Sequence, residues 1–326
     1  MSDAELLARA RTGDADAFAE LTGPYRRELL AHCYRMLAST QDAEDAVQDT
    51  MLSAWQHLGS FEGRSSLRTW LYRIATNRCL NALRSASRRP MRDNQDPRVN
   101  EVTWLEPYPD LLLEGLPDRR PGPEARYEAT EAISLAFITA LQLLPPRQRA
   151  ALILCDVLGY GAGEAADMLA TTYAAVASSL KHARATIARN ASAGTDPPPA
   201  PDSAAERELI RRLTTAYTAG DLDGMLALLT EDVRLSMPPH PFEYQGRAVA
   251  ADGLGRLFAQ GDHYRLIETR ANGQPALAVY RTDPHADIQH ANGLLVVTLA
   301  GARISAMTLF PPDVLRGFGL PRTLPR

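Results

Sequence analysis

Two proline-rich breaks divide this chain and limit the length of any continuous fold. The first break, at residues 93–128, holds the following prolines: Pro97, Pro107, Pro109, Pro117, Pro121 and Pro123. The second, at 191–203, contains the run DPPPAPD. Proline lacks a backbone N–H and clashes with the preceding turn of a helix, so no regular helix should cross either break. The 326 residues should therefore form three modules, at 1–92, 129–190 and 204–326, joined by two linkers.

Hydrophobic spacing predicts the class of each module. Apolar residues recur at intervals of three and four from Ala4 to Arg89 and from about Glu124 to Arg189, so the first two modules should be all-α. The third should be α+β, with helices near 204–219 and 223–229. Its strand-like runs are 233–237, 264–270, 277–281, 294–300 and 304–310. Turns at Asn272-Gly273 and at 300–302 favour an antiparallel sheet.

Composition favours a cytoplasmic protein without a membrane partner. Three separated cysteines, Cys33, Cys79 and Cys155, make neither a CxxC pair nor an even disulfide set. No apolar run approaches the ~20 residues of a membrane span, and the acidic start MSDAELLARA is not a signal peptide. Metal-ligand spacings, nucleotide-binding glycine loops and nucleophile elbows do not occur in the sequence. We therefore expect no metal, no cofactor and no catalytic residue.

The stretch from Gln41 to Leu58 should be an amphipathic helix. Asp42, Asp45 and Asp49 fall on one face. The opposite face is apolar and holds Ala43, Val47, Met51, Ala54, Trp55 and Leu58. An acidic face of this kind is either simply solvated or a docking surface, and the residues that follow favour docking.

Residues 64–92 contain no aspartate or glutamate but eight arginines, namely Arg64, Arg68, Arg73, Arg78, Arg84, Arg88, Arg89 and Arg92. Lys181 is the only lysine of the chain, so the absence of acids carries more weight than the number of arginines. An outward stripe at helical spacing consists of Asn77, Asn81, Arg84 and Arg88. Guanidinium groups neutralise phosphates and asparagine amides bind base edges, so this stripe fits nucleic acid. Trp70 and Tyr72 could stack on unpaired bases, although Trp70 fits the core equally well.

These residues resemble region 2 of the sigma-70 family, specifically of the extracytoplasmic-function (ECF) group. The resemblance rests on the runs AFAELTGPYRRELLAHCYRML, DAEDAVQDTMLSAW and SSLRTWLYRIATNRCLNALR. It implies that the clamp helices of the largest subunit of core RNA polymerase are bound by Asp42, Glu44, Asp45, Val47, Gln48 and Asp49. It also implies that residues 61–66 capture a flipped base of the −10 promoter element. The implied contacts to promoter DNA are Arg64, Ser65, Arg68, Arg73, Asn77, Asn81, Arg84 and Arg88.

The second module has the layout of a helix-turn-helix, although a plain helical hairpin fits the local pattern equally well. A scaffold helix near 162–169 and a turn at Ala170-Thr171 precede a second helix, whose N-cap should be Thr171 or Thr172. The run LPPRQRAALILCDVLGYGAGEAADMLATTYAAVASSLKHARA resembles sigma region 4, which recognises the −35 element and contacts the polymerase flap region. The implied DNA contacts are Thr172, Tyr173, Ser178, Lys181 and Arg184. Ala170, Ala174 and Ala175 depart from the commoner pattern and leave the base preference open.

The first linker holds nine acids and four arginines. It is either a solvated tether or, by the family resemblance, a segment that threads the RNA channel of the polymerase.

The third module resembles the SnoaL-like domains that are fused to a subset of ECF sigma factors, which form a cone of curved sheet closed by helices. The resemblance implies a regulatory domain that acts in cis on the two sigma modules. A candidate pocket for a small ligand is lined by Tyr217, Met237, Tyr244 and Tyr264. Some relatives of the fold are cyclases, and the residues to weigh for catalysis are Asp232, His240, Asp262 and His263.

The function expected from the whole sequence is that of an ECF sigma factor, which is not an enzyme, with a C-terminal regulatory domain. One alternative is a SnoaL-like enzyme or ligand sensor that the helical modules tether to DNA or polymerase. A plain helix-turn-helix repressor is the third hypothesis.

Overall fold

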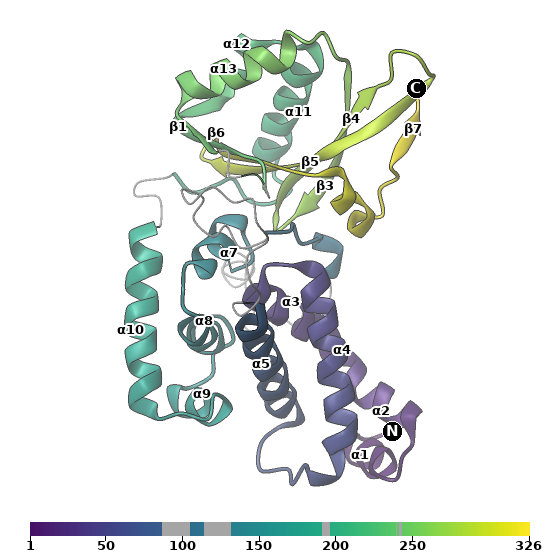
Figure 1. Cartoon of the computed structure of the whole chain (residues 1–326), viewed down its shortest axis with the longest axis vertical. Helices are drawn as coiled ribbons and strands as arrows, with labels where there is room; N and C mark the ends of the chain where they lie inside the picture. Colours follow the sequence, from purple (N-terminus) through teal and green to yellow (C-terminus); the bar gives the residue numbers. More distant parts are fainter. Residues whose placement is uncertain (87–104, 114–131, 191–195, 239, 241–242) are drawn as a thin grey trace. The chain divides into compact units, whose positions relative to one another are not determined.

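The computed structural model describes residues 1–86, 105–113, 132–190, 196–238, 240 and 243–326 (Figure 1). They belong to two compact units. The first combines residues up to 86 with residues 112–190, and the second combines residues 105–111 with those from 196 onward. Part of the predicted linker 93–128 is therefore built into the second unit instead of forming only a tether. The helix start expected near Glu124 lies outside the described residues.

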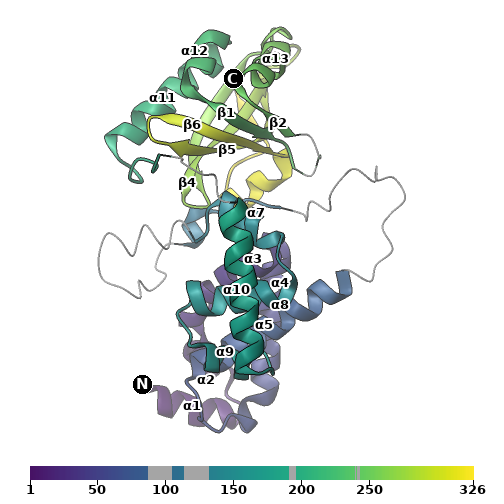
Figure 2. The same ribbon diagram turned by 90° about the vertical axis from the view of Figure 1, so that its left-hand side faces the viewer.

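The first unit is all-α, as predicted, and Figure 2 shows its helices from a second side. Its N-terminal part contains α1 (Asp3–Arg11), α2 (Ala15–Thr22), η1 (Gly23–Tyr25), α3 (Arg26–Leu37), α4 (Thr40–His57), η2 (Leu58–Ser60) and α5 (Leu67–Ala86). Its C-terminal part contains α7 (Leu135–Gln142), α8 (Pro146–Leu152), the π-helical turn η4 (Ile153–Val157), α9 (Ala162–Met168) and α10 (Tyr173–Asn190). The short helix η3 (Asp110–Leu112) spans the boundary between the units.

The turn between α3 and α4 shows why the acidic helix begins where it does. Ala38 ends α3 in the left-handed conformation, with φ of 59°. Ser39 then caps α4, because its side chain accepts a hydrogen bond of 3.1 Å from the backbone N–H of Asp42. A helix N-terminus also favours the negative charge that Asp42 brings to the first turn.

Helices α3, α4 and α5 pack their apolar faces into one core. Leu29, Met36, Ala54 and Leu71 are fully or almost fully buried there. His32 is also buried in this core, and its Nε2 lies 2.9 Å from Oγ1 of Thr76 across the α3–α5 contact. The apolar spacing of the sequence is thus satisfied by helix-on-helix packing.

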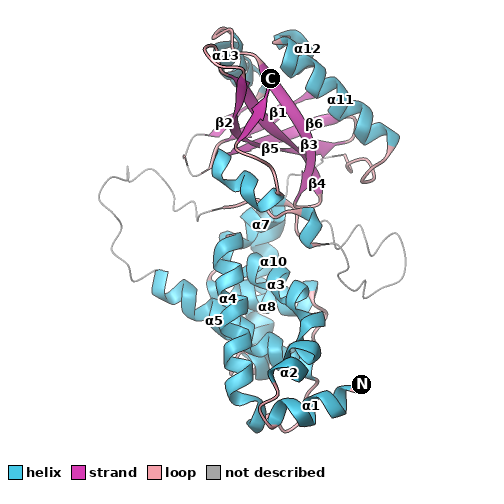
Figure 3. Ribbon diagram, turned by 90° about the vertical axis from the view of Figure 1, so that its right-hand side faces the viewer, coloured by secondary structure: helices cyan, strands magenta, loops and turns pink. Residues whose placement is uncertain are grey.

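The second unit is an α+β domain whose seven-stranded sheet carries helices on one side (Figure 3). Its helices are α11 (Ala204–Ala219), α12 (Leu222–Leu228), α13 (Arg247–Phe258) and η5 (Pro312–Phe318). Its strands are β1 (Leu229–Ser236), β2 (Glu243–Gln245), β3 (Tyr264–Ala271), β4 (Gln274–Thr282), β5 (Ile288–Ala300), β6 (Arg303–Phe310) and β7 (Thr323–Pro325). The strand order is β2-β1-β6-β5-β4-β3, and β7 pairs with the start of β5.

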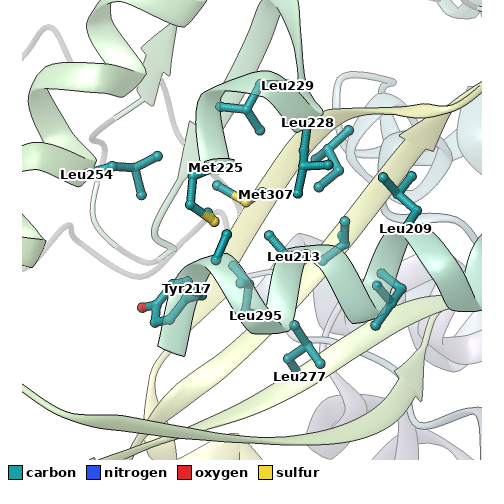
Figure 4. Close-up of a cluster of buried hydrophobic side chains, with 14 of the residues drawn as sticks. Leu209, Leu213, Tyr217, Met225, Leu228, Leu229, Leu254, Leu277, Leu295 and Met307 are labelled. Carbon is teal, nitrogen blue, oxygen red and sulfur yellow. The ribbon is translucent and has the colours of Figure 1, made fainter. Parts of the chain in front are cut away.

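The core of this domain lies between the sheet and helices α11 and α12 (Figure 4). Leu209, Leu213 and Tyr217 project from one face of α11 at helical spacing. They meet Met225 of α12 and strand residues that include Leu277, Leu295 and Met307. The strands contribute every second side chain to this core, because successive side chains of a strand point to opposite faces of the sheet.

The third module differs from the sequence prediction in two respects. The sheet is mixed, because β1 pairs with β6 in parallel while the other strand pairs are antiparallel. Helix α13 and the short strands β2 and β7 were not predicted. Helix α13 begins after a glycine, Gly246, whose positive φ of 94° turns the chain, and its alanines and glycines give only weak apolar periodicity.

We predict that the stability of the first unit falls in acid because of His32. Burial, with help from the nearby Arg35 and Arg68 charges, lowers the pKa of His32 to about 3. Its pKa in an unfolded chain is about 6.5, so the neutral ring stabilises the fold above that pH. This contribution is lost as pH falls from about 6.5 towards 3, by about 1.4 kcal/mol per pH unit.

Urea unfolding of the full chain at pH 7, 6 and 5 measures this effect. A His32→Gln variant keeps an amide that can bond Thr76 but does not titrate, so its free energy of unfolding should fall less steeply than that of the wild type. The exposed His57→Gln change serves as the control and should leave the wild-type slope unaltered. Equal slopes in wild type and His32→Gln would contradict the prediction.

Candidate nucleic-acid interface

The acidic face of α4 is open to solvent. Glu44, Asp45, Gln48 and Asp49 are all exposed, as is Asp42 at the start of the helix. Val47, which the family resemblance places among the polymerase contacts, is only 5% exposed and packs in the core. Of the six predicted docking residues, Val47 therefore helps to pack α4 onto the core and is not part of its exposed face.

One exposed residue of this face was missed. Leu52 lies three positions after Asp49 and seven after Asp45, on the same side of α4, and its side chain is 55% exposed. An apolar side chain within a carboxylate surface offers a partner both charge and buried area. The spacing of the sequence already placed Leu52 outside the predicted apolar face, but the sequence analysis did not name it as an exposed residue.

Helix α5 presents the polar stripe that the spacing predicted. Arg73, Asn77, Asn81 and Arg84 are exposed along its outer side. Arg84 donates a hydrogen bond of 3.2 Å from Nη1 to Oδ1 of Asn81, so the cation and the amide lie side by side. The last predicted member, Arg88, lies outside the described residues.

The aromatic residues of α5 belong to the core. Trp70 is 6% exposed and packs against Phe61, with ring centroids 5.1 Å apart. Tyr72 is 1% exposed and packs edge-on against His32, also at 5.1 Å. Stacking on unpaired bases is therefore not available to either ring in this structure, and the core interpretation of Trp70 holds.

Two arginines of the acid-free segment are paired with carboxylates from outside it. Arg64 lies 2.6 Å from Glu62, but both side chains are largely exposed, so this pair is weak. Arg68 donates to both carboxylate oxygens of Glu28, from Nε at 2.9 Å and from Nη2 at 2.6 Å. Burial is the largest single influence and would lower the pKa of Arg68, but the hydrogen bonds that Arg68 donates to Glu28 and Tyr160, with the charge of Glu28, together raise it. The absence of acids within residues 64–92 therefore does not leave Arg64 and Arg68 without carboxylate partners.

Helices α9 and α10 form the predicted helix-turn-helix. Ala170 makes the turn with φ of 48°, and the hydroxyl of Thr172 caps α10 by accepting a 3.2 Å hydrogen bond from the N–H of Ala175. Val176, Leu180 and Ala183 are buried on the inner side of α10. The predicted outward residues Thr172, Tyr173, Ser178, Lys181 and Arg184 are all exposed.

One of the cations that the sequence places on α10 is already paired with a carboxylate. Arg184 is held by Asp156, with hydrogen bonds of 2.9 and 2.7 Å, and this bond raises its pKa. From Thr172 to Leu180 the helix has no charged residue. Its first two turns therefore offer hydroxyls, methyl groups and the 65% exposed ring of Tyr173.

The sequence did not reveal that residues 108–110 of the linker bind the C-terminal domain. The backbone N–H of Tyr108 donates to Oδ1 of Asn272 at 2.8 Å, and the N–H of Asn272 donates to the carbonyl of Tyr108 at 2.8 Å. Pro109 forms an antiparallel bridge with Ala271 at the end of β3. Tyr108 is fully buried by this contact.

Asp110 completes the linker contact. Its carboxylate accepts a 2.7 Å hydrogen bond from the N–H of Gly273 and lies 3.4 Å from Arg270. Burial raises the pKa of Asp110 despite these partners. Arg270 also bonds Glu206 at 2.7 Å and Asp202 at 3.3 Å, so one guanidinium joins the linker, the β3–β4 turn and the start of α11. Below, the linker clamp means Tyr108, Pro109 and Asp110 together with Arg270, Asn272 and Gly273.

The four candidate pocket residues of the third module differ in how deeply they are buried. Tyr217 and Tyr264 are 5% and 7% exposed, and their rings pack edge-on with centroids 5.5 Å apart. Met237 and Tyr244 are half-buried. The two tyrosines therefore fill the core instead of lining free space.

The residues weighed for catalysis lie in ordinary structural positions. Asp262 accepts a 3.3 Å hydrogen bond from the hydroxyl of Tyr264 and lies 3.4 Å from Arg281. Asp232, His240 and His263 are exposed. Among the described residues, no group of three or more histidines, cysteines and acids could hold a metal ion. None of the described helices combines the length and the apolar character that a membrane span requires.

Three family models match the chain in the order of its modules. They are Sigma-70 region 2 at residues 21–89, Sigma-70 region 4 at 134–187 and the SnoaL-like domain at 210–307. The matches cover helices α3 to α5, the helix-turn-helix with α7 and α8, and most of the α+β domain.

Similar proteins carry the same assignment. The ECF RNA polymerase sigma factor SigG of Mycobacterium tuberculosis is 42% identical, and the alignment covers 97% of this chain and 86% of SigG. SigM of the same organism is 35% identical over 58% of this chain and 84% of its own length. The crystal structure of the M. tuberculosis ECF sigma factor SigJ shares the fold, with a TM-score of 0.60, 23% identity, and coverage of 92% of this chain and 98% of SigJ. The chain therefore belongs to the ECF RNA polymerase sigma factors.

Proposed function

We propose that this sigma factor docks on core RNA polymerase through the exposed face of α4 and holds promoter DNA along α5 and α10, under the control of its C-terminal domain. The carrying observation is the contrast between two neighbouring helices. Helix α4 exposes carboxylates, while the outer side of α5 exposes Arg73, Asn77, Asn81 and Arg84 without an acid among them. An acidic surface suits a basic protein partner, and a cationic amide-bearing surface suits nucleic acid.

The proposed protein partner of α4 is the pair of clamp helices on the largest polymerase subunit, with the flap region as the partner of the region 4 module. Asp45, Asp49 and Leu52 share one side of α4, which supports an interface with an apolar centre and a charged rim.

A small ligand is not part of this proposal, because the rings of Tyr217 and Tyr264 pack against each other inside the core.

The exposed carboxylates of α4 can be tested by reversing their charge. Replacing Asp45 and Asp49 with lysine should weaken binding to core polymerase at least tenfold, because like charges would then oppose the basic partner. Leu52→Ser should weaken binding by a smaller factor through lost apolar contact. Affinity measured by fluorescence anisotropy, together with run-off transcription, tests both changes.

Asp16→Lys with Glu20→Lys is the matched control, because both acids are exposed on the neighbouring helix α2 and the change in net charge is the same. These control changes should leave polymerase affinity within about twofold. If both double variants lose affinity equally, net charge and not the α4 surface explains the binding.

Substitutions on α5 can distinguish contacts to phosphates from contacts to bases. Replacing Arg73 and Arg84 with alanine should lower the slope of log affinity against log salt by about 2, since each lost phosphate contact contributes about 0.9. Asn77→Ala should leave this slope unchanged and relax the preference for the promoter sequence, because an amide reads base edges.

Binding of the holoenzyme to promoter and scrambled DNA at several salt concentrations provides both measurements. Arg212→Ala, an exposed arginine of α11, is the control for nonspecific loss of positive charge. A slope that Arg73→Ala and Arg84→Ala leave unchanged would exclude phosphate contacts at these positions.

Regulation in cis is supported by the linker clamp. The clamp holds the chain that joins the region 2 module to the region 4 module, so it limits how far the two modules can separate. Its backbone bonds to Asn272 and its half-buried Asp110 form a specific contact. The C-terminal domain can thereby act on both DNA-binding modules through the linker that joins them.

Weakening the linker clamp tests whether the C-terminal domain regulates transcription. Asn272 has φ of 58°, which glycine adopts without strain, so Asn272→Gly removes the acceptor of the Tyr108 N–H and keeps the turn. Leaving that buried N–H unsatisfied costs about 1–3 kcal/mol. Hydrogen exchange at residues 105–111 should therefore become faster, and promoter-dependent run-off transcription should change.

Truncation after residue 200 should change transcription in the same direction as Asn272→Gly, because both release the linker. The exposed Gln260→Ala change in the same domain is the control and should match the wild type in both assays. If Asn272→Gly speeds exchange but transcription and polymerase affinity stay at wild-type values, the linker clamp has no regulatory role.

A further inference from the structure

We propose that Asp156, in the π-helical turn before the helix-turn-helix, positions the guanidinium of Arg184 so that this arginine binds a DNA phosphate beside the −35 element. Asp156 is then a positioning residue, which acts through Arg184 and does not itself touch DNA. The inference rests on the proposed function in one respect, the assignment of α10 to the −35 element. It gives a role to an acid that a simple count of charges would treat as unfavourable near DNA.

The charged residues of α10 lie in its second half. No residue from Tyr173 to Leu180 is charged, and the helix then carries Lys181, Arg184 and Arg189 without an acid. The N-terminal residues of a recognition helix contact base edges, while arginine and lysine supply many of the contacts to phosphate. Arg184 follows Tyr173 by eleven positions and Lys181 by three, so these residues share one side of α10. Arg184 is therefore suited to a phosphate at the edge of the groove.

Two hydrogen bonds fix one edge of the Arg184 guanidinium. Its Nε donates to Oδ2 of Asp156 at 2.9 Å, and its Nη2 donates to Oδ1 at 2.7 Å. A guanidinium has five N–H donors. The remaining three, two on Nη1 and one on Nη2, bond no residue that the structure describes, and the side chain is 61% exposed. The edge that carries these donors can bind phosphate oxygens through two parallel hydrogen bonds.

The π-helical turn η4 determines where Asp156 lies. The N–H of Leu158 donates to the carbonyl of Ile153, five residues earlier, at 2.9 Å. Ile153 and Leu154 are fully buried and anchor the turn. A π turn contains more residues than an α turn and therefore changes the direction of its side chains, and such turns frequently occur at functional sites. Here the turn brings a carboxylate to a residue of α10 that is 28 positions later in the sequence.

The exposure of this ion pair favours positioning over stabilisation. The side chains of Arg184 and Asp156 are 61% and 33% exposed, and exposed ion pairs contribute little to the stability of a fold. A free arginine side chain loses considerable rotamer entropy when it binds a partner. Because Asp156 already restricts Arg184, less of that entropy is lost when DNA binds. The carboxylate thus strengthens a contact to DNA although its own charge repels phosphate.

The affinity of the holoenzyme for promoter DNA, measured with variants of the full chain, tests this role. Arg184→Ala should weaken binding at least tenfold, because a charge-assisted contact is lost. Asp156→Ala should weaken binding about threefold to tenfold, because Arg184 must then be ordered when DNA binds. Asp156→Glu keeps a carboxylate within reach and should recover most of this loss.

The double variant separates positioning from simple electrostatics. When Arg184 is already replaced by alanine, Asp156 is an unpaired acid near DNA, so Asp156→Ala should strengthen binding by about twofold. The same substitution therefore has opposite effects in the two backgrounds. If Asp156 only neutralised Arg184, its removal would strengthen binding in both. If the pair only stabilised the module, Asp156→Ala and Arg184→Ala would weaken DNA binding equally and lower the Tm equally.

Asp167→Ala is the matched control, because Asp167 is an exposed acid of α9 in the same helix-turn-helix and the change in net charge is the same. This variant should bind promoter DNA within about twofold of the wild type. NMR of the free full chain supplies a measurement without DNA. The Nε–H group of Arg184 should be rigid in the wild type and in Asp167→Ala, and it should become mobile in Asp156→Ala.

The proposal is overturned if Asp156→Ala binds promoter DNA as tightly as the wild type or more tightly. An Arg184 Nε–H group whose mobility does not change in Asp156→Ala overturns it as well. A wild-type holoenzyme that does not distinguish promoter from scrambled DNA counts instead against the proposed function. In that case the NMR measurement still decides whether Asp156 holds Arg184, because it needs no DNA.

Discussion

The packing of α3, α4 and α5 around one apolar core is the constraint on which the rest of region 2 depends. Burying Met36, Ala54 and Leu71 fixes the rotation of each helix. Once those rotations are set, Asp45 and Asp49 must face outward on α4, and Asn77 and Asn81 must do so on α5. The exposed faces hold the residues that the core does not use, and an acidic and a cationic surface therefore stand on neighbouring helices and point away from their shared core.

Arginine has three different roles in this chain, and burial separates them. Arg73 and Arg84 are exposed and can meet phosphates. Arg68 and Arg270 are partly buried and join elements through carboxylates. Arg149 is almost fully buried and is satisfied by carbonyl and amide oxygens instead. The planar guanidinium, with five donors in a fixed arrangement, can serve each of these environments, whereas a lysine ammonium cannot make the same forked contacts.

Two sets of contacts join distant parts of the chain, and they are built from different chemical groups. The linker clamp is built mainly from backbone hydrogen bonds and one half-buried carboxylate, so it depends on the conformation of residues 108–110. The contact between the region 2 and region 4 modules uses the buried cations Arg35 and Arg149, which donate to the backbone carbonyls of Ala132 and Met36. The C-terminal domain and the sigma modules therefore supply separate restraints, and each restraint can be weakened without removing the other.

The sequence by itself determined the class of each fold, the acidic and cationic faces and the helix-turn-helix, because apolar spacing and charge pattern act over a few residues. Helix α11 was placed at its observed bounds for the same reason. Only the tertiary structure decided that Arg68 pairs with Glu28, that Arg149 reaches the carbonyl of Met36, and that Tyr108 binds Asn272, 164 residues away. It likewise decided that β1 and β6 run parallel and that Tyr217 fills the core. Such contacts depend on which surfaces meet after the helices and strands have packed, and no local pattern of residues encodes that meeting.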